Sequence, residues 1–169
     1  LSLMEYSQKN SVPLLARGGG SSQCGQTVGE SVVLDYSKHQ NKILELNVEE
    51  KYVWVQPGVV LDHLNDYLKP HGLWFPVDVS TSSRATIGGM SANNSCGSRS
   101  LYYGNMVHNV LAIEAILDDG SIFQFDQINK NYLATKNNQD RLYKIIDKFI
   151  DVRQKVGSEI DANWPTTQR

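Results

Sequence analysis

The chain has 169 residues, of which 40% are hydrophobic and 20% are charged, and its formal net charge is −2 at pH 7. These values are ordinary for a globular domain, and they exclude the strongly basic surface of a nucleic-acid-binding module. No apolar run is long enough to cross a bilayer. The sequence starts at Leu1 and has no signal-peptide pattern. We therefore expect a fragment of a longer protein, located in the cytoplasm.

The first half of the chain predicts two helices and four short strands. Apolar residues at helical spacing indicate the helices, and short apolar or alternating runs indicate the strands. In chain order these are a helix at 1–10, a buried strand at 14–16, strands at 32–34, 43–48 and 52–56, and a helix at 60–68. The last two strands are expected to form a hairpin. Residues 35–41 are expected to be a polar connection, and Gly72 is expected to end the second helix.

The second half predicts a capped short helix, a hairpin and a long helix. Thr86 is expected to cap a helix that opens at Ile87. An Asp-Gly turn at 118–120 is expected to join a buried strand at 110–117 to a strand at 121–125. Apolar residues at helical spacing then predict an amphipathic helix at 139–156. The tail at 162–169 has no periodicity, and its Trp164 is expected to be exposed.

A glycine-rich stretch, Arg17–Gln26, joins the first two predicted strands. Three adjacent glycines, Gly18, Gly19 and Gly20, lack a Cβ, so the backbone can turn tightly and a ligand can approach it. Successive N–H groups in such a turn can converge on an anion, and Arg17 adds a permanent positive charge. The stretch fits a phosphate-binding loop, and it equally fits a flexible turn between strands.

A second stretch, Pro76–Gly97, is rich in small and hydroxyl-bearing residues. A helix start with two glycines, Gly88 and Gly89, would offer free N–H groups and a favourable dipole to a phosphate. The alternative is an ordinary surface loop of Ser, Thr and Asn. Because both stretches adjoin apolar strands, the pair fits a dinucleotide pyrophosphate better than a single phosphate.

Two common nucleotide-binding motifs are excluded by the residues of these loops. A Rossmann fingerprint needs a third glycine where this chain has Gln23, and a helix where it has a strand. A Walker A loop needs a lysine, and neither loop contains one. The irregular alternation of strands and helices favours an antiparallel α+β arrangement.

Several ordered motifs together resemble the FAD-binding domain of the vanillyl-alcohol oxidase/p-cresol methylhydroxylase (PCMH-type) flavoproteins. The similarity covers about residues 12–125, and it is strongest toward the branch of D-lactate dehydrogenase, glycolate oxidase and D-2-hydroxyglutarate dehydrogenase. The motifs that carry it are Arg17–Ser22, His71–Leu73, Phe75–Asp78, Ala85–Met90, Ala92-Asn93 with Gly97, and Tyr103-Gly104 with Asn109-Val110.

The resemblance implies an α+β fold of two α/β lobes with mixed or antiparallel sheets, truncated at both ends, with FAD between the lobes. The expected lobes are residues 1–78 and 79–160, followed by a linker, 161–169, toward a missing substrate domain. The tail is also similar to large members that continue into an iron–sulfur region. Membrane association of the full-length parent is a further implication.

The resemblance also implies the residues that bind the cofactor. They are Arg17, Gly18, Gly19, Gly20, Ser21, Ser22, Gly25, Gln26, Pro76, Asp78, Thr86, Gly88, Gly89, Ala92, Asn93, Ser95, Gly97, Tyr103, Gly104 and, on the adenine side, Ile122. FAD is expected to be noncovalent, because Ser21 stands where some members carry the histidine that is attached to the flavin. His108 replaces an Asp that is common in relatives, so a local hydrogen bond is expected to differ. Cys96, which replaces a small residue, is expected to be an inert packed thiol, and the alternative is a reactive thiol exposed near the flavin. No metal site is expected, since Cys24 and Cys96 lack a nearby His pair.

The activity that the resemblance implies is oxidation of a D-2-hydroxy acid, such as D-lactate, glycolate or 2-hydroxyglutarate, by hydride transfer to FAD. No catalytic residue is assigned, and the fragment alone is not expected to turn over substrate. Replacement of Gly19 by Val is expected to abolish FAD binding with the fold retained. One alternative is a non-catalytic nucleotide- or phosphate-binding module. An NADPH-dependent reductase of cell-wall precursors is disfavoured by the runs Pro76–Asp78 and Thr86–Met90.

Overall fold

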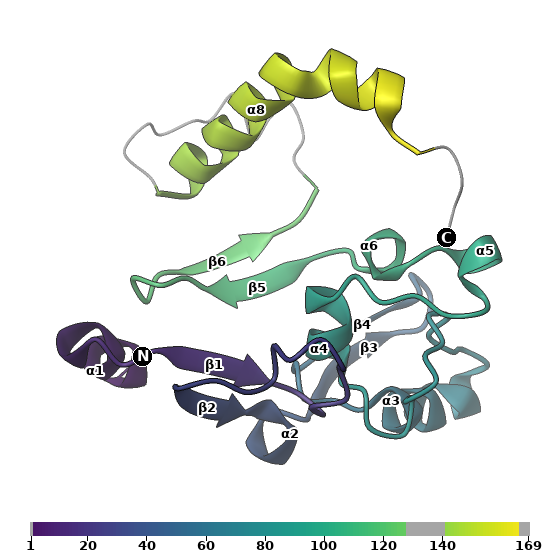
Figure 1. Cartoon of the computed structure of the whole chain (residues 1–169). Helices are drawn as coiled ribbons and strands as arrows, with labels where there is room; N and C mark the ends of the chain where they lie inside the picture. Colours follow the sequence, from purple (N-terminus) through teal and green to yellow (C-terminus); the bar gives the residue numbers. More distant parts are fainter. Residues whose placement is uncertain (1, 128–140, 166–169) are drawn as a thin grey trace. The chain divides into compact units, whose positions relative to one another are not determined.

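The computed structural model describes residues 2–127 and 141–165, and it divides into two compact units (Figure 1). The first contains the chain up to Val110 together with Asp118–Gly120, and the second contains Leu111–Leu117 and the chain from Ser121 on. The mixture of helices with small separate sheets confirms the predicted α+β class. The predicted lobes, 1–78 and 79–160, and the linker at 161–169 stay predictions.

The elements of the first unit agree with most of the predicted ones. They are, in chain order, α1 (Ser2–Asn10), β1 (Leu14–Arg17), β2 (Val32–Asp35), α2 (Tyr36–His39), β3 (Ile43–Asn47), β4 (Tyr52–Val55), α3 (Leu61–Leu68), the 3-10 helix η1 (Lys69–His71), α4 (Ile87–Ala92), α5 (Ser100–Tyr103) and α6 (Met106–Asn109).

Strands β1 and β2 pair in parallel, with Leu14 opposite Val32 and Arg17 opposite Asp35. This differs from the antiparallel arrangement that the sequence favoured. Parallel neighbours need a connection of a dozen or more residues, and the glycine-rich residues 18–31 supply it without a helix. Strand β1 is less buried than predicted, since Leu14 and Leu15 are half-buried and Ala16 is exposed.

The hairpin of β3 and β4 is confirmed as an antiparallel pair.

Helix α2 was not predicted, because its segment is polar throughout. The carboxylate of Asp35 accepts hydrogen bonds from the Ser37 N–H (2.9 Å) and hydroxyl (2.6 Å), and this cap begins the helical turn. Helix α3 and η1 end at Gly72, whose φ of 69° confirms it as the predicted stop.

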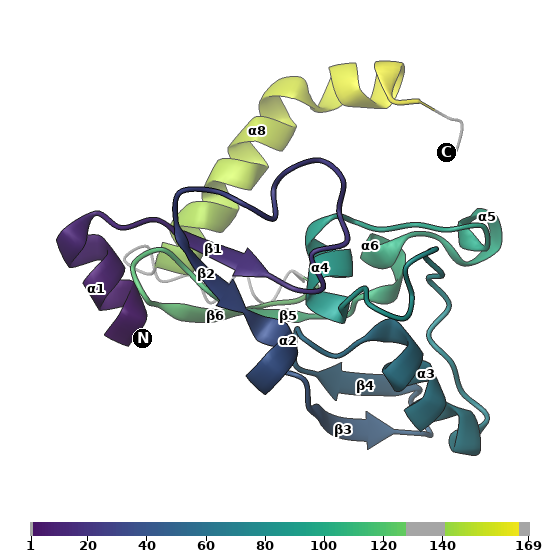
Figure 2. The same ribbon diagram turned by 60° about the horizontal axis from the view of Figure 1, so that its bottom comes forward.

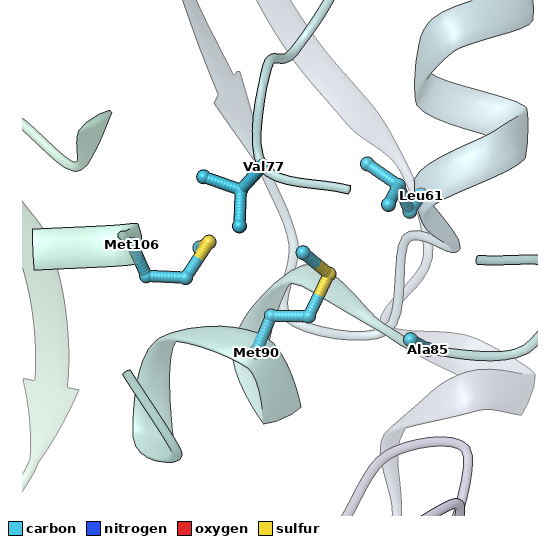
Figure 3. Packing of buried hydrophobic residues seen from close by; sticks show 5 residues of the cluster. All are labelled: Leu61, Val77, Ala85, Met90 and Met106. Carbon is cyan, nitrogen blue, oxygen red and sulfur yellow. The ribbon is translucent and has the colours of Figure 1, made fainter. Parts of the chain in front are cut away.

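The core of the first unit joins α3 to α4 and α6 (Figure 3). Its main cluster consists of Leu61, Val77, Ala85, Met90 and Met106, each no more than 6% exposed. In Figure 3 the side chains of Val77 and Met90 lie between those of Met106 and Leu61. A second cluster, farther along the same face of α3, packs against β3 and β4; it consists of Val59, Leu64 and Leu68.

The second unit holds one hairpin and one long helix. Strands β5 (Ile113–Ile116) and β6 (Ile122–Phe125) pair antiparallel, which confirms the predicted hairpin. The prediction of a buried first strand is wrong, because Ile113 is 46% exposed and Ile116 is 53% exposed.

Helix α8 spans Arg141–Asn163 and continues seven residues beyond the predicted end at Val156. An ion pair between Arg153 and Asp161 (2.9 Å) joins the predicted part of the helix to this extension. Trp164 is 71% exposed, as expected. The predicted helix start at 139–140 and the tail at 166–169 lie outside the described residues. Among the helices that the structure describes, none is long and apolar enough to cross a membrane.

Candidate functional site

The two stretches singled out in the sequence are called the first loop (Arg17–Gln26) and the second loop (Pro76–Gly97). They lie against each other in the first unit (Figure 2). A Cβ built on Gly18 would lie 2.0 Å from Thr86 Oγ1, and one on Gly19 would lie 2.1 Å from the backbone oxygen of Arg84. Contacts this short leave no room for a side chain at either position. The first two glycines therefore allow the first loop to pack on residues 84–86.

A polar bridge joins the same two loops farther along. The Gln26 amide donates to the hydroxyl oxygen of Ser22 (2.6 Å) and to Asn93 Oδ1 (3.2 Å). Gln26 lies near the end of the first loop, and Asn93 directly follows helix α4. The bridge and the glycine contacts bring the predicted cofactor residues of both stretches into one region.

The first loop keeps a set of unused hydrogen-bond donors. Within the described residues, the backbone N–H groups of residues 19–23 have no acceptor. Arg17 Nε is buried and has no hydrogen-bond partner, and a Cβ on Gly20 (φ 63°) would lie 3.3 Å from it. A buried donor without an acceptor is costly, and a cationic donor is suited to an anion. These donors fit one face of a diphosphate.

Helix α4 does not offer the free N–H groups that the sequence predicted. Thr86 does cap the helix, since its hydroxyl oxygen accepts from the Gly89 N–H (3.3 Å). However, the Ile87 N–H donates to the Val59 carbonyl and the Gly88 N–H donates to the Pro57 carbonyl, each at 2.8 Å. These N–H groups therefore hold α4 to the segment before α3, and the donors for an anion lie in the first loop.

Close packing also explains why glycine is needed at positions 88 and 97. A Cβ on Gly88 would lie 2.5 Å from Pro57 Cβ, and one on Gly97 would lie 1.5 Å from the backbone oxygen of Asp78. The sequence assigned both glycines to the cofactor, because packing against a distant residue leaves no local signal. The role of Pro57 was missed for the same reason.

The end of the second loop is held by side chains that sequence reasoning did not single out. Asn94 has a φ of 46°, a left-handed conformation that Asn tolerates better than most residues. Its Oδ1 accepts from the Val107 N–H (3.0 Å) at the start of α6. The two consecutive asparagines, Asn93 and Asn94, could have indicated this helix end, since Asn is favoured just after a helix.

His108 makes a hydrogen bond that an aspartate could also make. The Asn105 N–H donates to His108 Nδ1 at 3.0 Å, and the ring packs against Gly104, whose φ is 77°. A neutral imidazole nitrogen can accept this bond just as a carboxylate oxygen does. In this chain the acceptor of the Asn105 N–H is therefore an imidazole nitrogen.

The remaining predicted residues are distributed over both units. Pro76, Ala92, Ser95 and Tyr103 belong to the first unit, whereas Ile122 belongs to β6 of the second. The two cysteines are free and exposed, so the prediction of a packed thiol at Cys96 is wrong. In the part of the chain that the structure describes, no cluster of His, Cys, Asp and Glu could hold a metal ion.

Two carboxylates of the first unit have lowered pKa values. Hydrogen bonds from Ser98 and from the Arg99 N–H lower the pKa of Asp78, and hydrogen bonds from Ser37 lower that of Asp35. In each case the folded state favours the ionised form, whereas the unfolded chain takes up protons at a higher pH. The stabilisation is therefore complete above the unfolded pKa and is lost as the pH falls through the folded pKa.

We expect the free energy of unfolding to fall as the pH drops below about 4. Urea denaturation followed by circular dichroism at a series of pH values measures it. The variants Asp78→Asn and Asp35→Asn should be less stable at pH 7 and lose less on acidification. If the free energy of unfolding of both variants falls with pH as it does in the parent chain, these carboxylates do not cause the loss of stability in acid.

Comparison with known proteins places the chain among flavoproteins. A family model described as FAD binding domain matches residues 1–126. D-2-hydroxyglutarate dehydrogenase of Haemophilus influenzae is 46% identical over 127 residues, which are 75% of this chain and 12% of that protein. The mitochondrial D-lactate dehydrogenase [cytochrome] of Kluyveromyces lactis is 40% identical over 124 residues, which are 71% of this chain and 21% of that protein.

A solved structure of alkyldihydroxyacetonephosphate synthase has the same fold, with a TM-score of 0.64 and 23% identity over 78% of this chain and 24% of that one. The chain thus spans less than a quarter of the length of each of these relatives. The family match covers most of the chain and confirms the resemblance seen in the sequence. The chain belongs to the family of FAD-binding domains, and FAD is its cofactor.

Proposed function

We propose that the first loop holds the diphosphate of FAD, bound noncovalently. The observation that carries this proposal is the buried Arg17 Nε, which has no partner and lies beside Gly20, in the same loop as the unused N–H groups of residues 19–23. The exposed hydroxyl of Ser21 and the bridge from Gln26 to Asn93 lie in the same loops. The other predicted contacts, from Pro76 to Ile122 but without Asp78, stay proposals.

We further propose that the longer protein to which this domain belongs oxidises a D-2-hydroxy acid. The D-2-hydroxyglutarate dehydrogenases are 39–46% identical to this chain, so a hydroxy diacid is the favoured substrate class. FAD supplies the hydride acceptor for such a reaction, and the domain binds and orients it. An iron–sulfur region, a cytoplasmic location and membrane association of the longer protein stay predictions.

Titration with FAD tests the binding role of the first loop. We expect the chain to bind FAD and to give a flavin absorption band. The variant Arg17→Met should weaken binding by roughly 10-fold or more, because a charge-assisted hydrogen bond is lost. Lys9→Met makes the same charge change on helix α1, which has no buried residue, and should leave the affinity unchanged. Equal affinity of the parent chain and Arg17→Met would contradict this assignment of the diphosphate.

Flavin reduction tests the activity. A version extended by the downstream sequence should lose its flavin absorption when D-2-hydroxyglutarate is added without oxygen, and less readily with D-lactate or glycolate. Bound FAD that none of these acids reduces would favour the alternative, a non-catalytic nucleotide-binding module. Absence of FAD binding in both versions would exclude the flavoenzyme proposal itself.

A further inference from the structure

We propose that Asp78 is a positioning residue of the FAD site, which fixes the turn at residues 97–100 and does not contact the cofactor. The inference rests on the proposed function of the domain. It changes the role that the sequence suggested for Asp78, which was a contact close to FAD.

Both carboxylate oxygens of Asp78 are engaged by the turn. Oδ2 accepts from the Ser98 hydroxyl at 2.6 Å, and Oδ1 accepts from the Arg99 N–H at 3.0 Å. The residue before it, Val77, is fully buried in the main core cluster. The carboxylate thus extends from a rigid part of the backbone to a turn on the surface.

The turn is shaped to lie against Asp78. Gly97 lies so close to the backbone oxygen of Asp78 that a Cβ would come within 1.5 Å of it. The Gly97 N–H donates to the Ser100 hydroxyl oxygen (2.9 Å), and Ser100 is only 6% exposed. Side-chain hydrogen bonds and backbone packing therefore fix the same turn from two directions.

This turn ends the loop that contributes Asn93 to the bridge with the first loop. Two residues before Gly97, the Ser95 N–H donates to the Met90 carbonyl (2.9 Å) and the Met106 N–H donates to the Ser95 carbonyl (3.0 Å). Asn93 is thus held by the attachment at Ser95, whereas Gly97, which the resemblance assigned to the cofactor, lies on the side held by Asp78. Loss of the Asp78 bonds would release the turn that begins at Gly97 and leave the attachment at Ser95 in place.

Charge also argues against direct contact. A carboxylate facing a diphosphate would repel it, with an energy that grows as water is excluded. In the structure the negative charge of Asp78 is directed to donors on the turn. An acidic side chain can therefore stand close to a dianionic ligand and still favour its binding.

Four variants and one control test the proposal by the dissociation constant of FAD. Asp78→Ala removes both bonds, Ser98→Ala removes one, and Asp78→Asn keeps an oxygen that can accept from the Arg99 N–H. We expect Asp78→Ala to raise the dissociation constant of FAD roughly 10-fold, which is a typical cost of losing a residue that orients the groups in contact with a bound group. Asp78→Asn should restore part of the affinity, and the double variant Asp78→Ala/Ser98→Ala should match Asp78→Ala within about twofold, because coupled residues are not additive.

The control is Asn47→Ala, which removes a comparable turn bond, from the Glu50 N–H to Asn47 Oδ1 (2.9 Å), in the β3–β4 hairpin. Urea denaturation of every variant shows whether it is folded, and the control should lose stability without losing FAD affinity. If Asp78→Ala is unfolded, Ser98→Ala should still weaken FAD binding measurably.

Three outcomes would overturn the proposal while the parent chain binds FAD. They are unchanged affinity in both Asp78→Ala and Ser98→Ala, additive effects in the double variant, and tighter binding by Asp78→Asn, which would indicate direct repulsion. Failure of the parent chain itself to bind FAD would overturn the proposed function, and the positioning role with it.

Discussion

Replacing Gly19 with alanine should destabilise the first unit by about 1–3 kcal/mol or more, the usual cost of overpacking. The added Cβ would lie 2.1 Å from the backbone oxygen and 2.9 Å from the carbonyl carbon of Arg84. Backbone atoms cannot rotate away as the end of a long side chain can, so the two loops must separate. The same reasoning revises the expectation that Gly19→Val would abolish FAD binding with the fold retained.

Gly29→Ala is the matched control, because it lies in the same connection between β1 and β2. Its Cβ would meet only Ser31 Oγ, at an ordinary 3.7 Å. Urea denaturation should show a change within about 0.5 kcal/mol for the control, as for most surface substitutions. If Gly19→Ala is as stable as Gly29→Ala and loses only FAD binding, the glycine at position 19 is needed for the approach of FAD and not for the packing on Arg84.

Replacing Leu61 with alanine should lower the free energy of unfolding by about 2–5 kcal/mol, through lost burial and the cavity left behind. Leu61 is 1% exposed and lies at the start of α3 in the main core cluster (Figure 3). Met90 of α4 and Met106 of α6 belong to the same cluster. The cavity would thus loosen the packing of α4 and α6, the helices to which the second loop is attached.

The exposed leucine of α5 offers a control of identical chemistry. Leu101 is 78% exposed, so Leu101→Ala should change stability by no more than about 0.5 kcal/mol. Thermal and urea denaturation measure both variants, and FAD titration at 10 °C shows whether the remaining folded Leu61→Ala binds more weakly. Equal stability of the two variants would contradict the core described for the first unit.

The parts of the fold that could be predicted depend on local chemistry. Thr86 was recognised as a helix cap and Gly72 as a helix stop, because each acts on residues within a few positions. The Asp-Gly turn of β5 and β6 is local in the same sense. Parallel pairing of β1 with β2 has no local signal, since either direction fits two short apolar runs.

The residues assigned to the candidate site stay predictions, but the structure shows neighbours of its glycines that the sequence did not indicate. A glycine that admits a phosphate and a glycine that admits a neighbouring carbonyl look the same in a sequence. Gly18 and Gly88 proved to have partners in Thr86 and Pro57. The donors of α4 were predicted to be free because their acceptors, at positions 57 and 59, lie about 30 residues earlier in the chain.

The seating of the first loop on residues 84–86 has a consequence for the energetics of binding. Its glycine contacts and the bridge from Gln26 to Asn93 are made within the protein, so they hold the loop whether or not FAD is bound. A preorganised loop avoids most of the conformational entropy that a flexible one would lose on binding. Affinity should therefore depend on the rigidity of this packing as much as on the donors that we propose for the diphosphate.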